Sequence, residues 1–121
     1  MRIMIVDDSS IMRRAITKYL TPLGFEIVGT AGNGQEALQL YREQPAELVT
    51  LDITMPQMDG LACLQALKEI NSEVRVLVIS ALSDSQTGLK ALKLGAKSFL
   101  PKPFTEAQLI NEIQRIAGSK P

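Results

Sequence analysis

The sequence Ile3-Met4-Ile5-Val6-Asp7-Asp8 carries the strongest structural signal in the chain, because four apolar residues run without a break into two carboxylates. A short continuous apolar run is typical of a strand buried on both faces of a parallel sheet. The segments Leu48–Leu51 and Val74–Ile79 have the same character, so we expect these three strands to be central. Phe25–Val28 and Ser98–Leu100 are weaker strand signals and fit flanking or edge positions.

Segments with helical periodicity separate the strands. The first has its apolar residues on one stripe, and Ser9 or Ser10 can cap it. The fourth contains Gly88, which costs about 1 kcal/mol relative to alanine in a helix interior, so we expect this helix to be the loosest. The predicted helices are Ile11–Leu23, Gly34–Gln44, Asp59–Ile70, Ser83–Leu94 and a helix that Thr105 caps and Gly118 stops.

Five successive βα units with short connections predict a three-layer (βα)5 α/β fold, a doubly wound parallel sheet with helices on both faces. The 121 residues fit one domain over positions 1–121, with a short tail at 118–121. Sheets of this kind bind ligands beyond the carboxyl ends of their strands. The functional residues are therefore expected where the strands end.

The amino-acid composition excludes several classes of partner and of active site. The 13 basic and 13 acidic residues cancel, so we expect neither a nucleic acid nor a membrane as a direct partner. The chain has no histidine, which excludes Ser-His-Asp triads, histidine zinc ligands and a phosphohistidine of its own. Cys63 is predicted to be a buried filler. No apolar run approaches the roughly 20 residues that span a bilayer, and no signal peptide pattern follows Met1, so we expect a cytoplasmic protein.

Polar residues follow the predicted strands unevenly. Asp7 and Asp8 follow the first strand, Asp52 the third, Ser80 the fourth and Lys102 the fifth, whereas the second offers only Thr30. Taken singly, each fits a turn or a helix cap. Adjacent carboxylates at the end of an apolar strand repel each other, however, and this repulsion calls for a cation.

Three carboxylates and one ammonium sum to a charge of −2, which one divalent cation neutralises. A donor set of oxygen atoms favours Mg²⁺, or Mn²⁺, over zinc. Mg²⁺ usually takes its remaining ligands from water and phosphate, so the pattern indicates phosphoryl chemistry, and a carboxylate can itself be the nucleophile. Lys102 could spread the developing charge and Ser80 could donate a hydrogen bond to the transferred group.

The chain closely resembles the receiver domains of two-component response regulators, most of all the small stand-alone regulators of the chemotaxis type. The resemblance covers essentially the whole chain. It implies a flavodoxin-like sheet with strand order 2-1-3-4-5. The motifs that carry it are Ile5–Ser9, Leu51–Gly60, Ile79–Ala81 and Leu100–Phe104.

The resemblance also implies roles for single residues. Asp52 is the phosphoryl acceptor; Asp8, Asp52 and the backbone carbonyl of Thr54 hold Mg²⁺; and Asp7 supports the metal, often through water. Lys102 contacts the phosphoryl oxygens, and its peptide bond to Pro103 is usually cis. Pro56 and Gly60 shape the loop after the acceptor. Ser80 and Phe99 form a switch in which Phe99 turns toward the space that Ser80 vacates.

The implied phosphate donor is a phosphohistidine on a histidine kinase or phosphotransfer protein. The implied output surface comprises Ser83–Leu94, Ser98–Leu100 and the helix that begins at Thr105. A downstream partner such as the flagellar motor switch follows from the chemotaxis branch, and we expect a monomer before phosphorylation. Thr54 and Phe99 depart from the Asn and Tyr common in that branch. Phe99 lacks the hydroxyl that can lock an inward Tyr, which implies a less firmly held active state or a different partner. Thr54 and Leu82 flank the path of the hydrolytic water in the family, so the lifetime of the phosphorylated state does not transfer from a relative.

Alternatives stay open at this point. A Mg²⁺-dependent aspartyl-phosphate phosphatase of the haloacid-dehalogenase type also places an aspartate nucleophile on an α/β sheet, but its usual general acid position is Thr54 here. The chain could also be the receiver part of a longer regulator or a methylesterase. Arg13 and Arg14 fit a kinase-docking surface or a solvated helix face equally well. The glycine-rich stretch 29–34 matches no nucleotide-binding pattern and is predicted to turn into the second helix.

Overall fold

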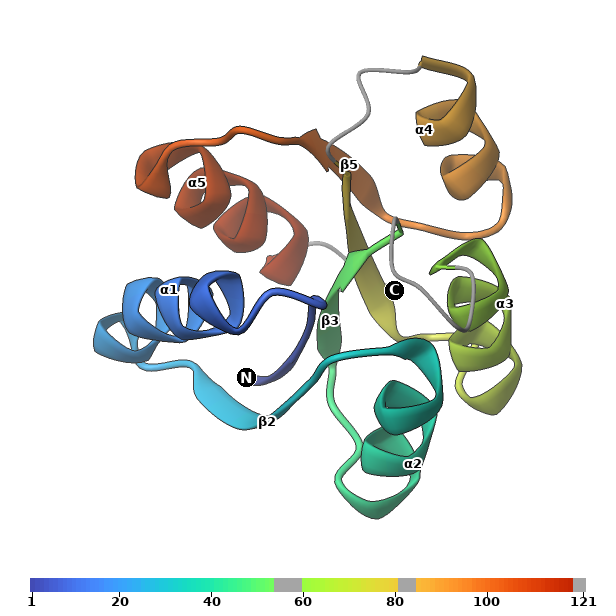
Figure 1. Ribbon diagram of the computed structural model, residues 1–121, viewed down its shortest axis with the longest axis horizontal. Coiled ribbons are helices and arrows are strands. Elements are labelled where there is room, and N and C mark those ends of the chain that lie inside the picture. The colour runs from blue at the N-terminus through green and yellow to red at the C-terminus, as the bar shows by residue number, and fades with distance from the viewer. Residues whose placement is uncertain (54–59, 81–84, 119–121) are drawn as a thin grey trace.

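The computed structural model describes residues 1–53, 60–80 and 85–118. Five parallel strands form one sheet in the order β2-β1-β3-β4-β5, which confirms the predicted fold class and strand order (Figure 1). The strands are β1 (Arg2–Val6), β2 (Glu26–Ala31), β3 (Leu48–Asp52), β4 (Arg75–Ser80) and β5 (Ser98–Pro101).

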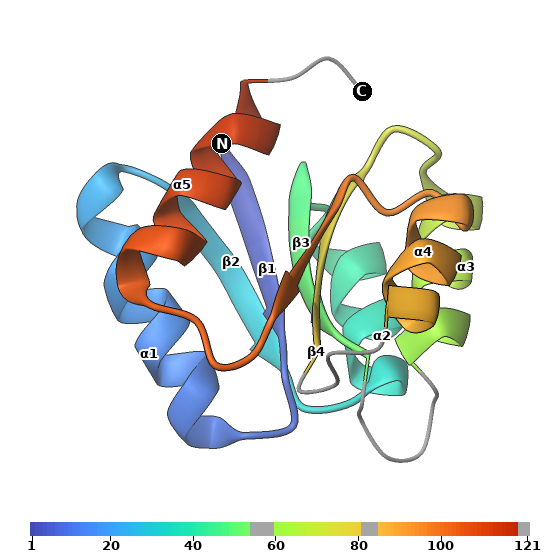
Figure 2. The same cartoon turned by 90° about the horizontal axis from the view of Figure 1, so that it is seen from above.

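Helices cover both faces of the sheet. Helices α1 and α5 lie on one face, and α2, α3 and α4 lie on the other (Figure 2). The side chain of Ser9 caps α1 by accepting a hydrogen bond from the Met12 amide, and Thr105 forms a capping box with Gln108 at the start of α5. The helices are α1 (Ser10–Leu20), α2 (Gly34–Glu43), α3 (Gly60–Ile70), α4 (Ser85–Lys93) and α5 (Glu106–Ala117), with a short 3-10 helix at Thr21–Leu23.

The sheet separates two hydrophobic clusters. Alternate residues of β4 show this division: Val76 and Val78 pack with α2, α3 and α4, whereas Leu77 and Ile79 pack with α1 and α5. Cys63 is fully buried in the first cluster, as its apolar sequence context predicts. Burial on both faces explains why the central strands appear in the sequence as unbroken apolar runs.

The first predicted helix is too long. The α-helix ends at Leu20 rather than Leu23, and the chain continues as a 3-10 turn that contains Pro22 and ends at Gly24, which has a φ of 89°. Proline has no backbone N–H for the helical ladder, and glycine adopts a left-handed conformation without strain. The apolar stripe therefore extends further than the α-helix itself.

The second predicted strand is too short. It runs over Glu26–Ala31 rather than Phe25–Val28, so Gly29, Thr30 and Ala31 belong to the sheet and not to a turn. The register between β1 and β2 shifts next to Gly29, which pairs with Met4. A Cβ atom on Gly29 would lie 2.9 Å from Cδ2 of Leu40. The glycine therefore makes room for this side chain of α2 and does not form a turn.

The fourth helix contains Gly88 in its interior and extends over Ser85–Lys93, with Gly95 at a φ of 107° just beyond its end. The predicted start at Ser83 lies outside the described residues, as do Asp59 at the predicted start of α3 and the end of the tail. That α4 is the loosest helix stays a prediction.

Candidate functional site

Two of the predicted site carboxylates lie where β1 and β3 end side by side. Val6 pairs with Leu51 across the two strands, so Asp7 and Asp52 follow at the same level of the sheet. Their exposed fractions are 1% and 2%, whereas Asp8 is exposed. One carboxylate oxygen from each of Asp7, Asp8 and Asp52 lies within 4.8 Å of the other two. The structure therefore brings the three carboxylates together.

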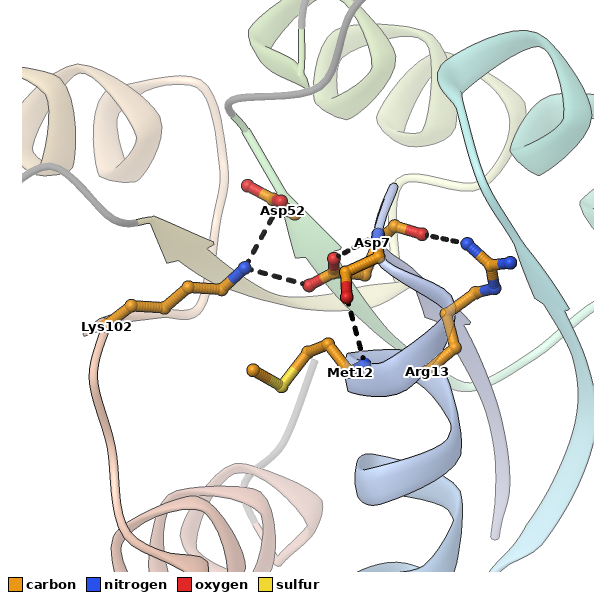
Figure 3. Close-up of polar contacts among 6 residues, drawn as sticks. Asp7, Met12, Arg13, Asp52 and Lys102 are labelled. Carbon is orange, nitrogen blue, oxygen red and sulfur yellow. Dashed lines mark hydrogen bonds and ion pairs between the residues drawn. The ribbon is translucent and has the colours of Figure 1, made fainter.

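Lys102 reaches this cluster from the loop after β5. Its Nζ atom lies 3.0 Å from Oδ2 of Asp7 and 3.3 Å from Oδ2 of Asp52 (Figure 3). Its backbone N–H donates to the carbonyl of Ser80 over 2.7 Å, which ties the loop to the end of β4. The peptide bond between Lys102 and Pro103 is cis, in agreement with the expectation from the resemblance.

Asp7 is held by more than the lysine. The Ser9 amide donates to its Oδ1 atom over 2.9 Å, and Nη1 of Arg13 donates to its backbone carbonyl over 2.7 Å (Figure 3). Arg13 was singled out from the sequence only as a docking or solvated residue. Its bond to Asp7 shows a third role, which is to fix the backbone at the end of β1.

Burial and neighbouring charges shift the pKa values of Asp7 and Lys102. Burial raises the pKa of Asp7, and this effect outweighs the opposing hydrogen bonds from Ser9 and Lys102. Burial by itself lowers the pKa of Lys102, but the hydrogen bond to Asp7 and the charge of Asp52 raise it overall. The Lys102 ammonium faces two carboxylates and stays charged, whereas Asp7 and Asp52 share this single positive charge.

This arrangement fits a hard divalent cation. The donors are carboxylate oxygens, with no nitrogen or sulfur ligand in the cluster, and their charge exceeds that of Lys102 by two. Such a donor set suits Mg²⁺, which accepts one or two carboxylates and keeps several water molecules. Thr54, whose carbonyl was predicted as a further ligand, lies outside the described residues, as do Pro56 and Leu82.

Gly60 brings α3 against the end of β3. A Cβ atom at Gly60 would lie 2.1 Å from the Cα atom of Ile53, a distance that no side chain tolerates because the obstacle is backbone. The glycine therefore allows the chain to return close to Asp52 after the loop. The loop itself, residues 54–59, lies outside the described residues, so the loop-shaping role implied by the resemblance stays a prediction.

Ser80 and Phe99 lie on the same face of the sheet. Ser80 is fully buried at the end of β4, where it pairs with Pro101, and Phe99 pairs with Val78 one step earlier. Since side chains alternate along a strand, Ser80 faces the α2–α4 side together with Val78. Phe99 is half-buried against the same cluster. The sequence analysis did not foresee its neighbour on α4, Gly88, because a glycine inside a helix carries no signal of its contact partner.

A basic groove lies between α1 and β2. Its volume is about 470 Å³, and it includes Arg13, Arg14 and Lys18. Its full lining is Ser10, Arg13, Arg14, Thr17, Lys18 and Thr30. The sequence analysis pointed to the two arginines, and to Thr30 only as the polar residue after the second predicted strand. It missed Lys18, one helical turn after Arg14.

Among the residues that the structure describes, no helix is long and apolar enough to cross a membrane.

Comparison with known proteins gives one consistent family. The model of the response regulator receiver domain matches residues 3–114. Chemotaxis protein CheY of Bacillus subtilis (strain 168) is 40% identical over 114 residues, which cover 94% of this chain and 95% of that protein. A protein-glutamate methylesterase/protein-glutamine glutaminase of Archaeoglobus fulgidus is 42% identical over 105 residues, 85% of this chain but only 30% of that protein.

The fold comparison agrees. A crystal structure of the CheX-CheY-BeF3-Mg²⁺ complex from Borrelia burgdorferi matches with a TM-score of 0.93 and 38% identity, and covers 98% of this chain and 90% of that chain. These matches favour the interpretation as a receiver domain over a phosphatase of the haloacid-dehalogenase type. The chain belongs to the response regulator receiver domain family.

Proposed function

We propose that this protein is a phosphoacceptor response regulator in which Asp52 receives a phosphoryl group from a phosphohistidine of a kinase or phosphotransfer protein. The observation that supports this proposal most directly is the position of Lys102, whose ammonium lies between Asp7 and Asp52 with Asp8 close by. Lys102 can contact incoming phosphoryl oxygens, and a divalent cation on the carboxylates would offset the negative charge that the phosphoryl group brings to the site.

Asp52 is the proposed nucleophile among the three carboxylates. Asp7 accepts hydrogen bonds at both carboxylate oxygens, from Ser9 and from Lys102, and Asp52 accepts one from Lys102 at its Oδ2 atom. Asp8 is exposed, and hydration of its carboxylate makes it a weaker nucleophile. Asp52 is buried at the end of a central strand, where a donor can approach from beyond the sheet.

In the proposed reaction, a carboxylate oxygen of Asp52 attacks phosphorus, the bond from phosphorus to the imidazole nitrogen breaks, and the electron pair stays on that nitrogen. Lys102 contacts the transferred group and stabilises its negative charge. Asp7 and Asp8, with Asp52 and the carbonyl of Thr54, would hold Mg²⁺, which neutralises charge on the phosphoryl oxygens when it is bound. The same groups assist the later attack of water, so the protein catalyses its own phosphorylation and dephosphorylation without a metabolic substrate.

The proposed response lies on the α4–β5–α5 surface. A phosphoryl group on Asp52 would draw the hydroxyl of Ser80 toward it, and Phe99 would turn toward the vacated space. Both residues lie on one face of the sheet, so the two movements can be linked. The surface includes exposed apolar side chains at Leu89 and Leu92, which suit a protein partner.

The proposed setting is cytoplasmic chemotaxis signalling, with a histidine kinase upstream and an output protein such as the flagellar motor switch downstream. The similarity to chemotaxis proteins named CheY over nearly the full chain supports this branch. The same comparison includes a methylesterase of which this domain matches a part. We propose that the unphosphorylated form is a monomer.

The test is the intact mass of the protein after incubation with acetyl phosphate, with Mg²⁺ or with a chelator. We expect one phosphoryl adduct that requires Mg²⁺ and is absent in Asp52→Asn. The matched control is Glu69→Gln, which removes an exposed carboxylate on α3 and should leave the adduct unchanged. Borohydride reduction, which converts an acyl phosphate to homoserine, followed by peptide mapping should locate the product at position 52. An adduct that persists in Asp52→Asn, or that maps to Ser80, would contradict the proposal.

A further inference from the structure

Gly88, in the middle of α4, lies against the ring of Phe99. A Cβ atom on Gly88 would lie 3.3 Å from Cγ of Phe99 and 3.4 Å from each of Cδ1 and Cδ2. Three nearly equal distances place that missing atom over the ring. A side chain at position 88 would therefore touch the ring more tightly than usual, and the ring would have to give by a few tenths of an ångström.

The backbone does not require glycine at this position. Only Gly24 and Gly95 have positive φ values among the described glycines, and Gly88 continues the helix from Ser85 to Lys93. Glycine is the poorest helix former after proline. A glycine that weakens α4 without serving a turn is explained by the close approach of the Phe99 ring.

The start of β5 is tied to α5 on the opposite face of the sheet from the Phe99 ring. The hydroxyl of Ser98, the residue before Phe99, donates to Oε1 of Glu112 on α5 over 2.5 Å, and Glu112 is also paired with Arg115. Ala91, near the end of α4, is buried in the cluster against which the half-buried Phe99 packs. Pro101, which pairs with Ser80, lies two residues beyond Phe99 on the same face of the sheet.

We propose that Gly88 is a positioning residue that holds the Phe99 ring in its resting position against α4, and that a side chain at position 88 shifts the ring toward Ser80. This inference rests on the proposed function, because it assigns the resting position of Phe99 in the proposed switch to the contact between its ring and Gly88. A substitution that destabilises the resting position of the Phe99 ring lowers the free energy needed to move the ring away. By linkage, it raises the affinity of the protein for a ligand that binds more tightly when the ring is in its other position.

The test uses the protein labelled with 4-fluorophenylalanine at its three phenylalanines. The resonance of Phe99 is identified as the one that disappears in Phe99→Leu. Its position is recorded in the free protein and after addition of beryllofluoride with Mg²⁺, a mimic of the phosphoryl group. The same measurements are made on Gly88→Ala, after circular dichroism has established that it is folded, and on Gly88→Ala combined with Phe99→Leu.

We expect Gly88→Ala to move the Phe99 resonance of the free protein toward its position in the beryllofluoride complex and to tighten beryllofluoride binding at least about fivefold. The tightening should vanish in the Phe99→Leu background, because the effect acts through the ring. A gain that persists in that background shows a general effect of a better helix former and overturns the inference. An unmoved resonance, or one that moves the opposite way, also overturns it.

The proposed function fails in a different way. If the natural protein binds no beryllofluoride in the presence of Mg²⁺, the phosphoacceptor proposal and this inference both fall. If the natural protein binds it and Gly88→Ala changes neither the Phe99 resonance nor the affinity, only the role of Gly88 is excluded.

Discussion

The ammonium of Lys102 lies 3.0 Å from a carboxylate oxygen of Asp7, although the two residues are 95 positions apart in the chain. The fold alone brings them together, since β1 is a central strand and the loop after β5 reaches back across the end of β4. Lys102 is therefore the resident counter-ion of a carboxylate cluster that has more charge than one lysine can neutralise.

Lys102→Met should weaken the fold without Mg²⁺ and strengthen the binding of Mg²⁺. Loss of the ammonium leaves two buried carboxylates without their cation, which should cost about 1–3 kcal/mol of unfolding free energy. The same loss removes a positive charge that repels the metal. Urea unfolding with and without Mg²⁺, together with calorimetric titration, measures both effects. Lys18→Met, in the last turn of α1, is the control. Weaker Mg²⁺ binding in Lys102→Met would contradict the electrostatic argument.

Asp52→Asn should lower the pKa of Asp7, because the charge of Asp52 is one of the causes that raise it. A raised pKa in the folded state means that this group favours folding when protonated. Its contribution is present below the unfolded pKa and is lost as the pH rises through the folded pKa. Asp52→Asn should therefore reduce the loss of stability that deprotonation of Asp7 causes at neutral pH. Carbon-13 NMR of the carboxyl groups checks the direction, and an unchanged Asp7 titration would be evidence against the coupling.

Glu112→Gln should remove a pH-dependent part of the stability. The hydrogen bond from Arg115 is the main cause that lowers the pKa of Glu112, and the bond from Ser98 adds to it. A lowered folded pKa stabilises the protein above the unfolded pKa, and this contribution is lost as the pH falls through the folded pKa. Because the pair is partly solvated, we expect no more than about 1 kcal/mol. Denaturant unfolding of both proteins should differ at pH 7 and converge in acid.

Gly60→Ala should destabilise the protein by about 3 kcal/mol or more, because its new methyl group would collide with the backbone of Ile53. Gly118→Ala is a matched control at the end of α5, where the nearest atom to the new methyl group, a carbonyl oxygen of Gln114, lies 3.6 Å away. Thermal unfolding of the two variants measures the difference. Equal melting temperatures would show that the chain near Gly60 can yield.

The sequence was sufficient to predict the central strands and the position of the acidic site. Burial on both faces makes β1, β3 and β4 visible as apolar runs, and the ends of parallel strands must meet at one edge, so Asp7, Asp52 and Lys102 could be placed near one another. The strand order came from the family resemblance, because local patterns contain no information about which strands are neighbours.

The features that the sequence did not reveal depend on contacts between distant elements. Gly29 looks like a turn residue, but it lies in β2 and makes room for Leu40. Gly88 looks like a weak point of a helix, but it lies against Phe99. The interpretation of Gly29 as a turn residue was wrong, and Gly88 was identified only as costly within a helix. In both cases the packed neighbour explains the glycine.

The division of the interior into two hydrophobic clusters has a mechanical consequence. Ser80 and Phe99 face one cluster, whereas the neighbouring residues Ile79 and Leu100 face the other. A rearrangement of the first pair acts directly on the cluster beneath α2, α3 and α4, whereas α1 and the buried side of α5 pack against the opposite cluster. The sheet acts as a partition, so one half of the molecule can change shape while the other half preserves the fold.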